Sequence, residues 1–125
     1  MYDDFTVTDR WTGEQIHCTY QAVVVAIATR HADAVDIKFV CNGRPVWVAL
    51  PHRAWVEYKA RTGKVITDPL AVQIAGQYLK SSIESGYDNG REMYTLTADE
   101  TLEHLEVVMA EYKSSRALPV MPRVG

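Results

Sequence analysis

The chain has 125 residues, of which 47% are apolar and 23% are charged, and its formal net charge is −3. This size and composition are typical of one globular domain with a single core, and the negative charge argues against a general polyanion-binding protein. The acidic start, Met1 to Asp4, lacks the basic region of a signal peptide, and no apolar run approaches the ~18 residues of a membrane span. We therefore expect a cytoplasmic protein that has no membrane partner.

Residues 5–20 are predicted to form a first β-hairpin. Thr12-Gly13 is a turn signal, and a two-residue turn there would set Phe5 opposite Tyr20. His17 would then lie on the polar side of the hairpin as an exposed strand residue.

The second strand is predicted to continue through residues 21–30. The apolar residues change from even-numbered to odd-numbered positions near Gln21-Ala22. This change indicates either a β-bulge or one long strand that buries different faces along its length. A loop of three residues, 31–33, would set Val25 opposite Phe39 in the next strand.

The segment Ala34–Leu50 carries the clearest structural signal. Asn42-Gly43 suits a two-residue type I′ turn, because both central positions of that turn need positive φ. The turn fixes the register, with one apolar side and one mixed side, and it predicts a cation–π contact between Lys38 and Trp47. The predicted facing pairs are Cys41 with Arg44, Phe39 with Val46, Ile37 with Val48 and Val35 with Leu50 on the apolar side, and Asp36 with Ala49, Lys38 with Trp47 and Val40 with Pro45 on the other.

Three helices are predicted after the strands. The first is His52–Thr62, ended by Gly63. The second is Pro69–Ser85, with Asp68 as its N-cap, Gly86 as its stop and Gly76 packed closely against another backbone. The third begins at the capping box of Thr97 and Glu100 and runs to about Ser115.

Strands followed by helices predict an α+β fold, in which a four-stranded antiparallel meander is covered on one face by three helices. Residues 87–94 are expected to form a loop or a short hairpin turn. We expect a single domain over residues 1–116, followed by an apolar, proline-containing tail at 117–125.

The sequence shows no motif for a metal, a cofactor or a nucleotide. The four histidines have no ligand at metal spacing, and His104 is expected to be an exposed partner of Glu100, four residues before it. Cys18 and Cys41 are interpreted as small buried residues in a reducing compartment and not as a disulfide. Whether the chain is an enzyme stays open at this point, and the absence of a catalytic motif favours a protein that is not one.

The basic segment 51–64 supplies two weaker hypotheses. Its cations could face nucleic acid or phosphate, with two aromatic residues among them. Alternatively, a small-ligand pocket or an enzyme site could form near His52, next to the hairpin. The candidate nucleic-acid residues are Arg53, Lys59, Arg61 and Lys64, and the candidate ligand residues are His52, Arg53, Glu57, Lys38 and Trp47.

The leading hypothesis is a non-catalytic binding protein. A sheet that is covered on one face leaves its other face open, and that face is expected to carry Trp47, Val40, Val24 and Trp11 or its neighbours. An exposed apolar patch of this kind indicates a protein partner, and a homodimer is the commonest closed assembly. We therefore expect a homo-oligomer.

Overall fold

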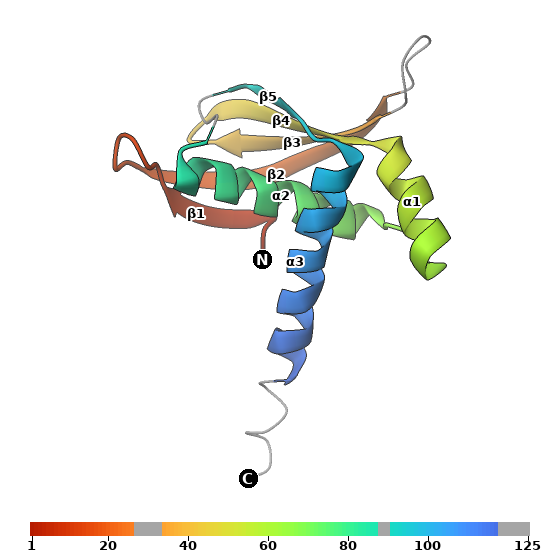
Figure 1. The fold of residues 1–125 in the computed structure, drawn as a ribbon. Coiled ribbons are helices and arrows are strands. Elements are labelled where there is room, and N and C mark those ends of the chain that lie inside the picture. The colour runs from red at the N-terminus through yellow and green to blue at the C-terminus, as the bar shows by residue number, and fades with distance from the viewer. Residues whose placement is uncertain (27–33, 88–90, 118–125) are drawn as a thin grey trace.

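The computed structural model describes residues 1–26, 34–87 and 91–117. The fold is α+β, as predicted, and Figure 1 shows the helices gathered below one mostly antiparallel sheet. The strands are β1 (Asp4–Thr8), β2 (Gln15–Ala26), β3 (Ala34–Cys41), β4 (Arg44–Pro51) and β5 (Met93–Thr95), and the helices are α1 (His52–Thr62), α2 (Asp68–Ser85) and α3 (Ala98–Ala117).

The sheet has the order β1-β2-β3-β4-β5, so the four predicted strands form a meander and a fifth strand is added at its edge. β5 pairs in parallel with β4. The prediction of a loop or a short hairpin turn at residues 87–94 was therefore wrong for Met93 and Tyr94, and residues 88–90 lie outside the described part of the chain. Three residues are too few to show a strand period, and the pairing depends on distant backbone groups: the Trp47 N–H donates to the Glu92 carbonyl at 2.8 Å, and the Leu96 N–H donates to the Ala49 carbonyl at 3.0 Å.

The central hairpin has the predicted turn and register. Asn42 has φ 50° and Gly43 has φ 85°, as a type I′ turn requires. Every predicted facing pair between β3 and β4 is present. The ammonium group of Lys38 lies 5.8 Å from the centroid of the Trp47 ring, which confirms the predicted cation–π contact.

The register of the first hairpin differs from the prediction by two residues, since Phe5 pairs with Cys18 and not with Tyr20. The turn is longer than expected: the Asp9 N–H donates to the Glu14 carbonyl at 2.8 Å. A type I′ turn at Thr12-Gly13 would need positive φ at both residues, and only Gly13 has it, with φ 73°. A shift of two residues leaves every side chain on the face of the sheet that was predicted for it. His17 is exposed, as expected.

The strand β2 contains the β-bulge that was one of the two alternatives. The pairing with β3 shifts between Tyr20 and Ala22, which leaves Gln21 as the extra residue. The predicted pairing of Val25 with Phe39 was wrong, because Val25 pairs with Val35. The proposed loop at residues 31–33 lies outside the described residues.

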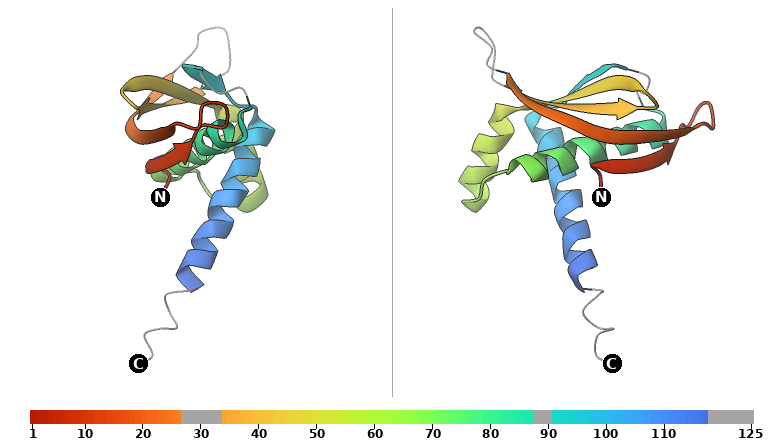
Figure 2. Two further views of the ribbon diagram at one scale, coloured as in Figure 1. Left: turned by 90° about the vertical axis from the view of Figure 1, so that its left-hand side faces the viewer. Right: turned by 180° about the vertical axis from the view of Figure 1, so that it is seen from behind.

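The helices lie on one side of the sheet, as both views of Figure 2 show. α1 has the predicted bounds and ends at Gly63, and α2 ends at Gly86. The N-cap of α2 is Thr67 and not Asp68, because the Thr67 hydroxyl accepts the Leu70 N–H at 3.3 Å. The predicted capping box of α3 is present: the Thr97 N–H donates to the carboxylate of Glu100 at 2.8 Å.

The core lies between the helices and the apolar side of the hairpins. α2 crosses beneath the sheet, and its central residues are almost all buried. Gly76 faces the backbone of Tyr2, so the predicted close approach at this glycine is confirmed. The fully buried side chains include Ile37, Phe39, Val48, Leu50, Ile74, Leu79, Tyr94 and Val108.

The sequence also led to expectations about a membrane span and about the C-terminal boundary of the domain. Within residues 1–26, 34–87 and 91–117, no helix combines the length and the apolar character needed to cross a membrane. Residues 118–125, most of the predicted tail, lie outside the described part of the chain, so the domain boundary at residue 116 stays a prediction.

Candidate functional site

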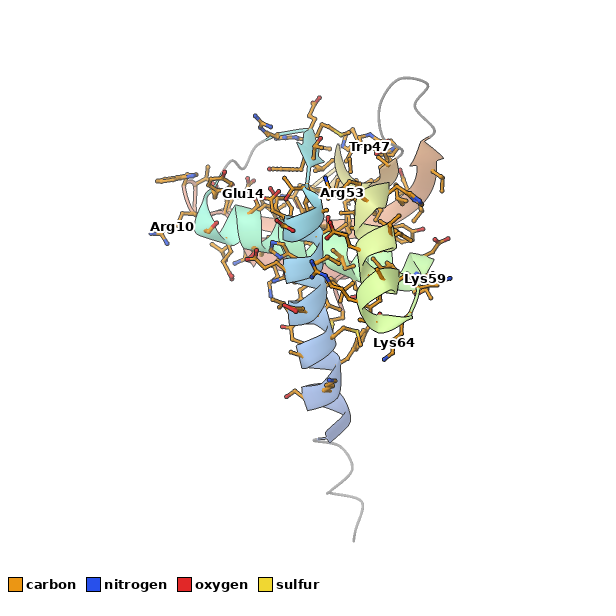
Figure 3. All side chains as sticks on the ribbon, turned by 45° about the vertical axis from the view of Figure 1, so that its right-hand side comes forward. Arg10, Glu14, Trp47, Arg53, Lys59 and Lys64 are labelled. Carbon is orange, nitrogen blue, oxygen red and sulfur yellow. The ribbon has the colours of Figure 1, made fainter. Side chains whose placement is uncertain are left out.

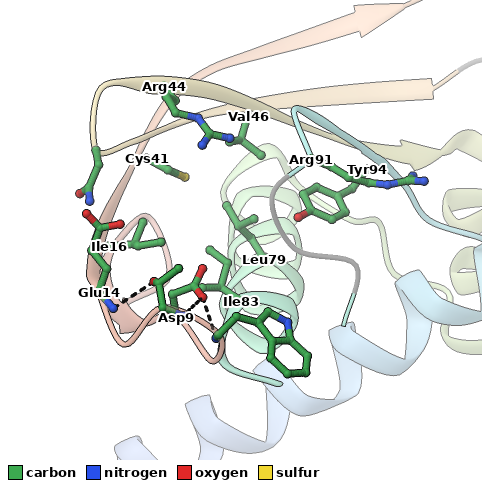
Figure 4. Close-up of a pocket in the computed structure, with 13 residues that line it drawn as sticks. Asp9, Glu14, Ile16, Cys41, Arg44, Val46, Leu79, Ile83, Arg91 and Tyr94 are labelled. Carbon is green, nitrogen blue, oxygen red and sulfur yellow. Dashed lines mark hydrogen bonds between the residues drawn. The ribbon is translucent and has the colours of Figure 1, made fainter. Parts of the chain in front are cut away.

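A cleft of about 480 Å³ lies at one end of the molecule. Figure 4 shows it between the β1–β2 turn, the β3–β4 turn, the end of α2 and the start of β5. The sequence did not point to this cleft, because it is assembled from four segments that are distant in the chain. Its lining includes the apolar Ile16, Val46, Leu79 and Ile83, the charged Asp9, Glu14, Arg44 and Arg91, and Cys41, Trp11 and Tyr94.

The rim of the cleft is held by hydrogen bonds of the β1–β2 turn. The carboxylate of Asp9 accepts the backbone N–H groups of Trp11 at 2.8 Å and Thr12 at 3.0 Å. The hydrogen bond from Thr12 is the largest of the effects that lower the pKa of Asp9. The indole N–H of Trp11 donates to the Gly86 carbonyl at 2.9 Å, which ties the turn to the end of α2. Trp11 therefore lies on the helix side of the sheet, and its expected place on the opposite face was wrong.

A second, shallower groove of about 420 Å³ runs along the outer side of α1. It is lined by His52, Trp55, Val56, Lys59, Ala60 and Val65. The Trp55 indole N–H is already used, since it donates to the Ile66 carbonyl at 3.0 Å. The groove is therefore a mainly apolar surface whose lining also includes His52 and Lys59.

The candidate ligand residues do not converge on one point. His52 lies on the groove, whereas Arg53 and Glu57 occupy another stripe of α1, where Arg53 pairs with Glu57 at 3.4 Å. Lys38 and Trp47 stack on each other on the sheet, as described above, and Figure 3 shows Trp47 on a different element from Arg53.

The candidate nucleic-acid residues are also divided. Arg53 and Arg61 both pair with Glu57, each at 3.4 Å. Lys59 points away from Arg53 on the helix, and Lys64 follows the end of α1 (Figure 3). One carboxylate thus partly offsets two of the four cations, and of the other two, Lys59 lines the groove and Lys64 does not. This geometry does not bring the four cations together into one patch.

The side of the sheet that faces away from the helices, here called the open face, is defined by Val24, Asp36, Lys38, Val40, Trp47 and Met93. These residues share one face because side chains alternate along each strand and the register aligns them across it. Val24 and Met93 are each 45% exposed. Val40 and Trp47 are half-buried, and burial raises the pKa of Asp36. Figure 2 shows no helix on this side.

His104 is not the exposed residue that was expected. It is half-buried, its Nδ1 contacts the side-chain oxygen of Gln77, and its ring meets the Tyr78 ring edge-to-face at 5.2 Å. The contact with the amide oxygen of Gln77 suits a neutral ring that donates from Nδ1. Burial lowers the pKa of His104, against the opposing effect of Glu103 and Glu100.

The lowered pKa of His104 predicts a loss of stability in acid. A base whose pKa is lower in the folded state contributes full stability above its unfolded pKa of about 6.5, and this is lost as the pH falls through the folded value. Urea unfolding at about pH 7 and about pH 5.5 should therefore show a drop in the free energy of unfolding that is smaller in the variant His104→Gln. Equal drops in both proteins would contradict the assignment.

Three comparisons bear on the identity of the chain. Known protein families, curated proteins and solved structures give no match to it. Among the described residues, no group of three or more His, Cys, Asp or Glu side chains could hold a metal ion. The cleft, the groove and the open face are the surface features of the chain that bear on its function.

Proposed function

We propose that this protein is a non-catalytic binding module of the cytoplasm that acts as a homodimer joined through the open face. The observation that supports this is the exposure of Val24 and Met93 on a sheet face that carries no described helix. Apolar groups on such a face are removed from water when a second surface covers them, and this is the main favourable contribution to association.

A second copy of the chain suits the open face because the charges on that face are self-complementary. Asp36 and Lys38 are two residues apart on β3, so their side chains point to the same side. A two-fold axis that lies in the interface and crosses β3 between them would set Asp36 of each copy against Lys38 of the other. This is the reciprocal pairing that an isologous interface requires.

The size of the open face sets the expected affinity. Strands of eight residues are about 27 Å long, and five strands are about 19 Å across, which gives roughly 500 Å² of flat surface. Stable complexes bury about 800 Å² on each partner, so this dimer belongs to the weak class. We expect a dissociation constant in the micromolar range, which corresponds to about −8 kcal/mol at 1 μM.

Sedimentation over a series of protein concentrations tests the proposal with two matched valines. Val24 on the open face is 45% exposed and Val56 on α1 is 57% exposed. Val24→Asp should weaken dimerisation by about tenfold or more, because it replaces an exposed apolar side chain of the interface with a carboxylate beside Asp36, its facing residue on β3. Val56→Asp should leave it unchanged. A monomer at all concentrations for the unaltered protein, or equal effects of the two variants, would count against the open face.

A charge exchange tests the arrangement of the two copies. Asp36→Lys and Lys38→Asp should each weaken the dimer, by about 1–2 kcal/mol, because each creates two symmetric like-charge contacts. The double exchange restores opposite charges across the interface and should recover most of the affinity. If the double variant is as weak as the single variants, the two-fold arrangement proposed above is wrong.

The cleft supports a second candidate function, the binding of a small ligand. Concave sites with an apolar lining and a few polar groups are typical of ligand pockets, and here Arg44 lies beside the apolar Ile16 and Val46. A medium-chain carboxylate such as decanoate is a suitable probe. Its addition should shift the NMR signals of residues 16, 46 and 79, and shifts confined to the open face would oppose this candidate.

Nucleic-acid binding by the basic helix stays a hypothesis with its own test. It requires binding that weakens with salt and is lost when Arg53, Lys59 and Arg61 are reversed in charge. The pairing of both arginines with Glu57 makes this function less favoured than self-association. No binding at low salt would end it.

A further inference from the structure

Cys18 and Cys41 lie directly opposite each other on neighbouring strands, β2 and β3. The Asn42 N–H donates to the His17 carbonyl at 3.0 Å, so a ladder hydrogen bond passes beside this pair and not between its two members. That pattern defines a non-hydrogen-bonded position, where facing Cα atoms are about 4.5 Å apart and side chains approach most closely. A disulfide needs Cα atoms about 4.4–6.8 Å apart, so this register meets the requirement.

The two thiols differ in their access to solvent. Cys18 is 0% exposed and Cys41 is 7% exposed. Cys41 also lines the cleft (Figure 4), whereas Cys18 is not among the residues that line it. A small molecule that enters the cleft therefore meets Cys41 first.

The surroundings of the two thiols also shift their pKa values in opposite directions. A hydrogen bond from Cys18 lowers the pKa of Cys41 against the effect of burial, and the charge of Arg44 lowers it further. Arg44 is close because it is the facing partner of Cys41 across the hairpin turn. The same hydrogen bond, together with burial, raises the pKa of Cys18. Cys41 is thus the better thiolate and Cys18 the proton-bearing partner.

We infer that Cys41 and Cys18 form a hydroperoxide-sensitive dithiol site that closes reversibly to a cross-strand disulfide. The Cys41 thiolate attacks the terminal oxygen of a hydroperoxide, the O–O bond breaks, and the leaving oxygen takes a proton to give water or an alcohol. This step leaves Cys41 as a sulfenic acid. The Cys18 sulfur then attacks the Cys41 sulfur, the S–O bond breaks, and the departing hydroxide takes the Cys18 proton to form water. Two thiols are oxidised and one peroxide is reduced.

The reduced full-length protein, treated with equimolar hydrogen peroxide, provides the direct test. The expected product is a monomeric chain lighter by two hydrogen atoms, whose peptide map links Cys18 to Cys41 and whose mass returns to its starting value with dithiothreitol. Unchanged thiols, a link between two chains, or separate over-oxidation of each cysteine would overturn the proposal.

Two further measurements test the order of the steps. In the unaltered reduced protein, iodoacetamide should label Cys41 about tenfold faster than Cys18, because it is the accessible thiolate. Cys18→Ala should stop the reaction at a sulfenic acid on Cys41 that dimedone traps, whereas Cys41→Ala should not react. Faster labelling of Cys18, or trapping on Cys18, would contradict the assigned roles, and if either variant fails to fold, the labelling of the unaltered protein decides.

Discussion

Replacing Phe39 with alanine is expected to lower the free energy of unfolding by about 3–5 kcal/mol, the usual cost of deleting a buried aromatic side chain. Phe39 is 0% exposed at the centre of β3. Its ring meets those of Phe5 at 6.2 Å and Tyr20 at 6.4 Å, both edge-to-face. Loss of the ring would therefore leave a cavity at the point where β1, β2 and β3 share their packing. Urea unfolding followed by circular dichroism measures the change.

The neighbouring residue supplies the control for that substitution. Val40 follows Phe39 in β3, but its side chain lies on the open face and is half-buried. Val40→Ala should cost no more than about 1 kcal/mol, because the site can refill with water and leaves no closed cavity. A loss below about 1.5 kcal/mol for Phe39→Ala would mean that the predicted core does not depend on this ring.

Replacing Gly76 with alanine is expected to destabilise the protein by about 1–3 kcal/mol, although the same change inside an ordinary helix stabilises it by about 1 kcal/mol. A Cβ atom at residue 76 would lie 2.2 Å from the Tyr2 carbonyl oxygen and 2.7 Å from the Tyr2 Cβ. Tyr2 cannot move away cheaply, because its N–H donates to the Gln73 side chain at 2.7 Å and its hydroxyl donates to Glu111 at 2.7 Å.

Removal of residues 1–3 provides a control with the opposite sign. Without Tyr2 the three atoms nearest to the new methyl group are gone, so alanine at residue 76 should then stabilise the shortened chain by about 1 kcal/mol. Chemical denaturation of the four proteins measures both differences. A stabilising effect of alanine in the full-length chain would show that the N-terminal segment does not pack on α2 as described.

The parts of the fold that follow from local chemistry were predictable from the sequence. Asn42-Gly43 determines its turn within two residues, and that turn fixes every pair between β3 and β4. The capping box of α3 and the glycine stops of α1 and α2 have the same local character. Each of these signals is satisfied within a few residues of itself, so tertiary contacts do not override it.

The errors arise where distant groups decide the structure. The β1–β2 register is an exception, because a local group sets it: the Asp9 side chain closes a longer turn than Thr12-Gly13 indicated. The strand β5 exists because the edge of β4 offers unpaired backbone groups to a short segment. His104 is covered by residues of α2, which the spacing within α3 cannot reveal.

The candidate sites also divide into features that local residues determine and features that distant groups determine. Consecutive residues on a helix differ by about 100° in direction, so His52 and Arg53 point to different sides of α1 although they are neighbours in the sequence. Lys38 and Trp47 were correctly paired because the hairpin register controls them. The cleft and the facing positions of Cys18 and Cys41 depend on how several strands are arranged in space. They could therefore not be predicted from the sequence.

The most direct test of the proposed function is an isotope-filtered NOE experiment on a mixture of labelled and unlabelled chains at high concentration. Self-association through the open face predicts intermolecular NOEs between the Trp47 indole of one copy and open-face residues of its partner. NOEs that instead join residues along the α1 groove, or none at a concentration where sedimentation shows a dimer, would contradict the assignment of the open face as the interface.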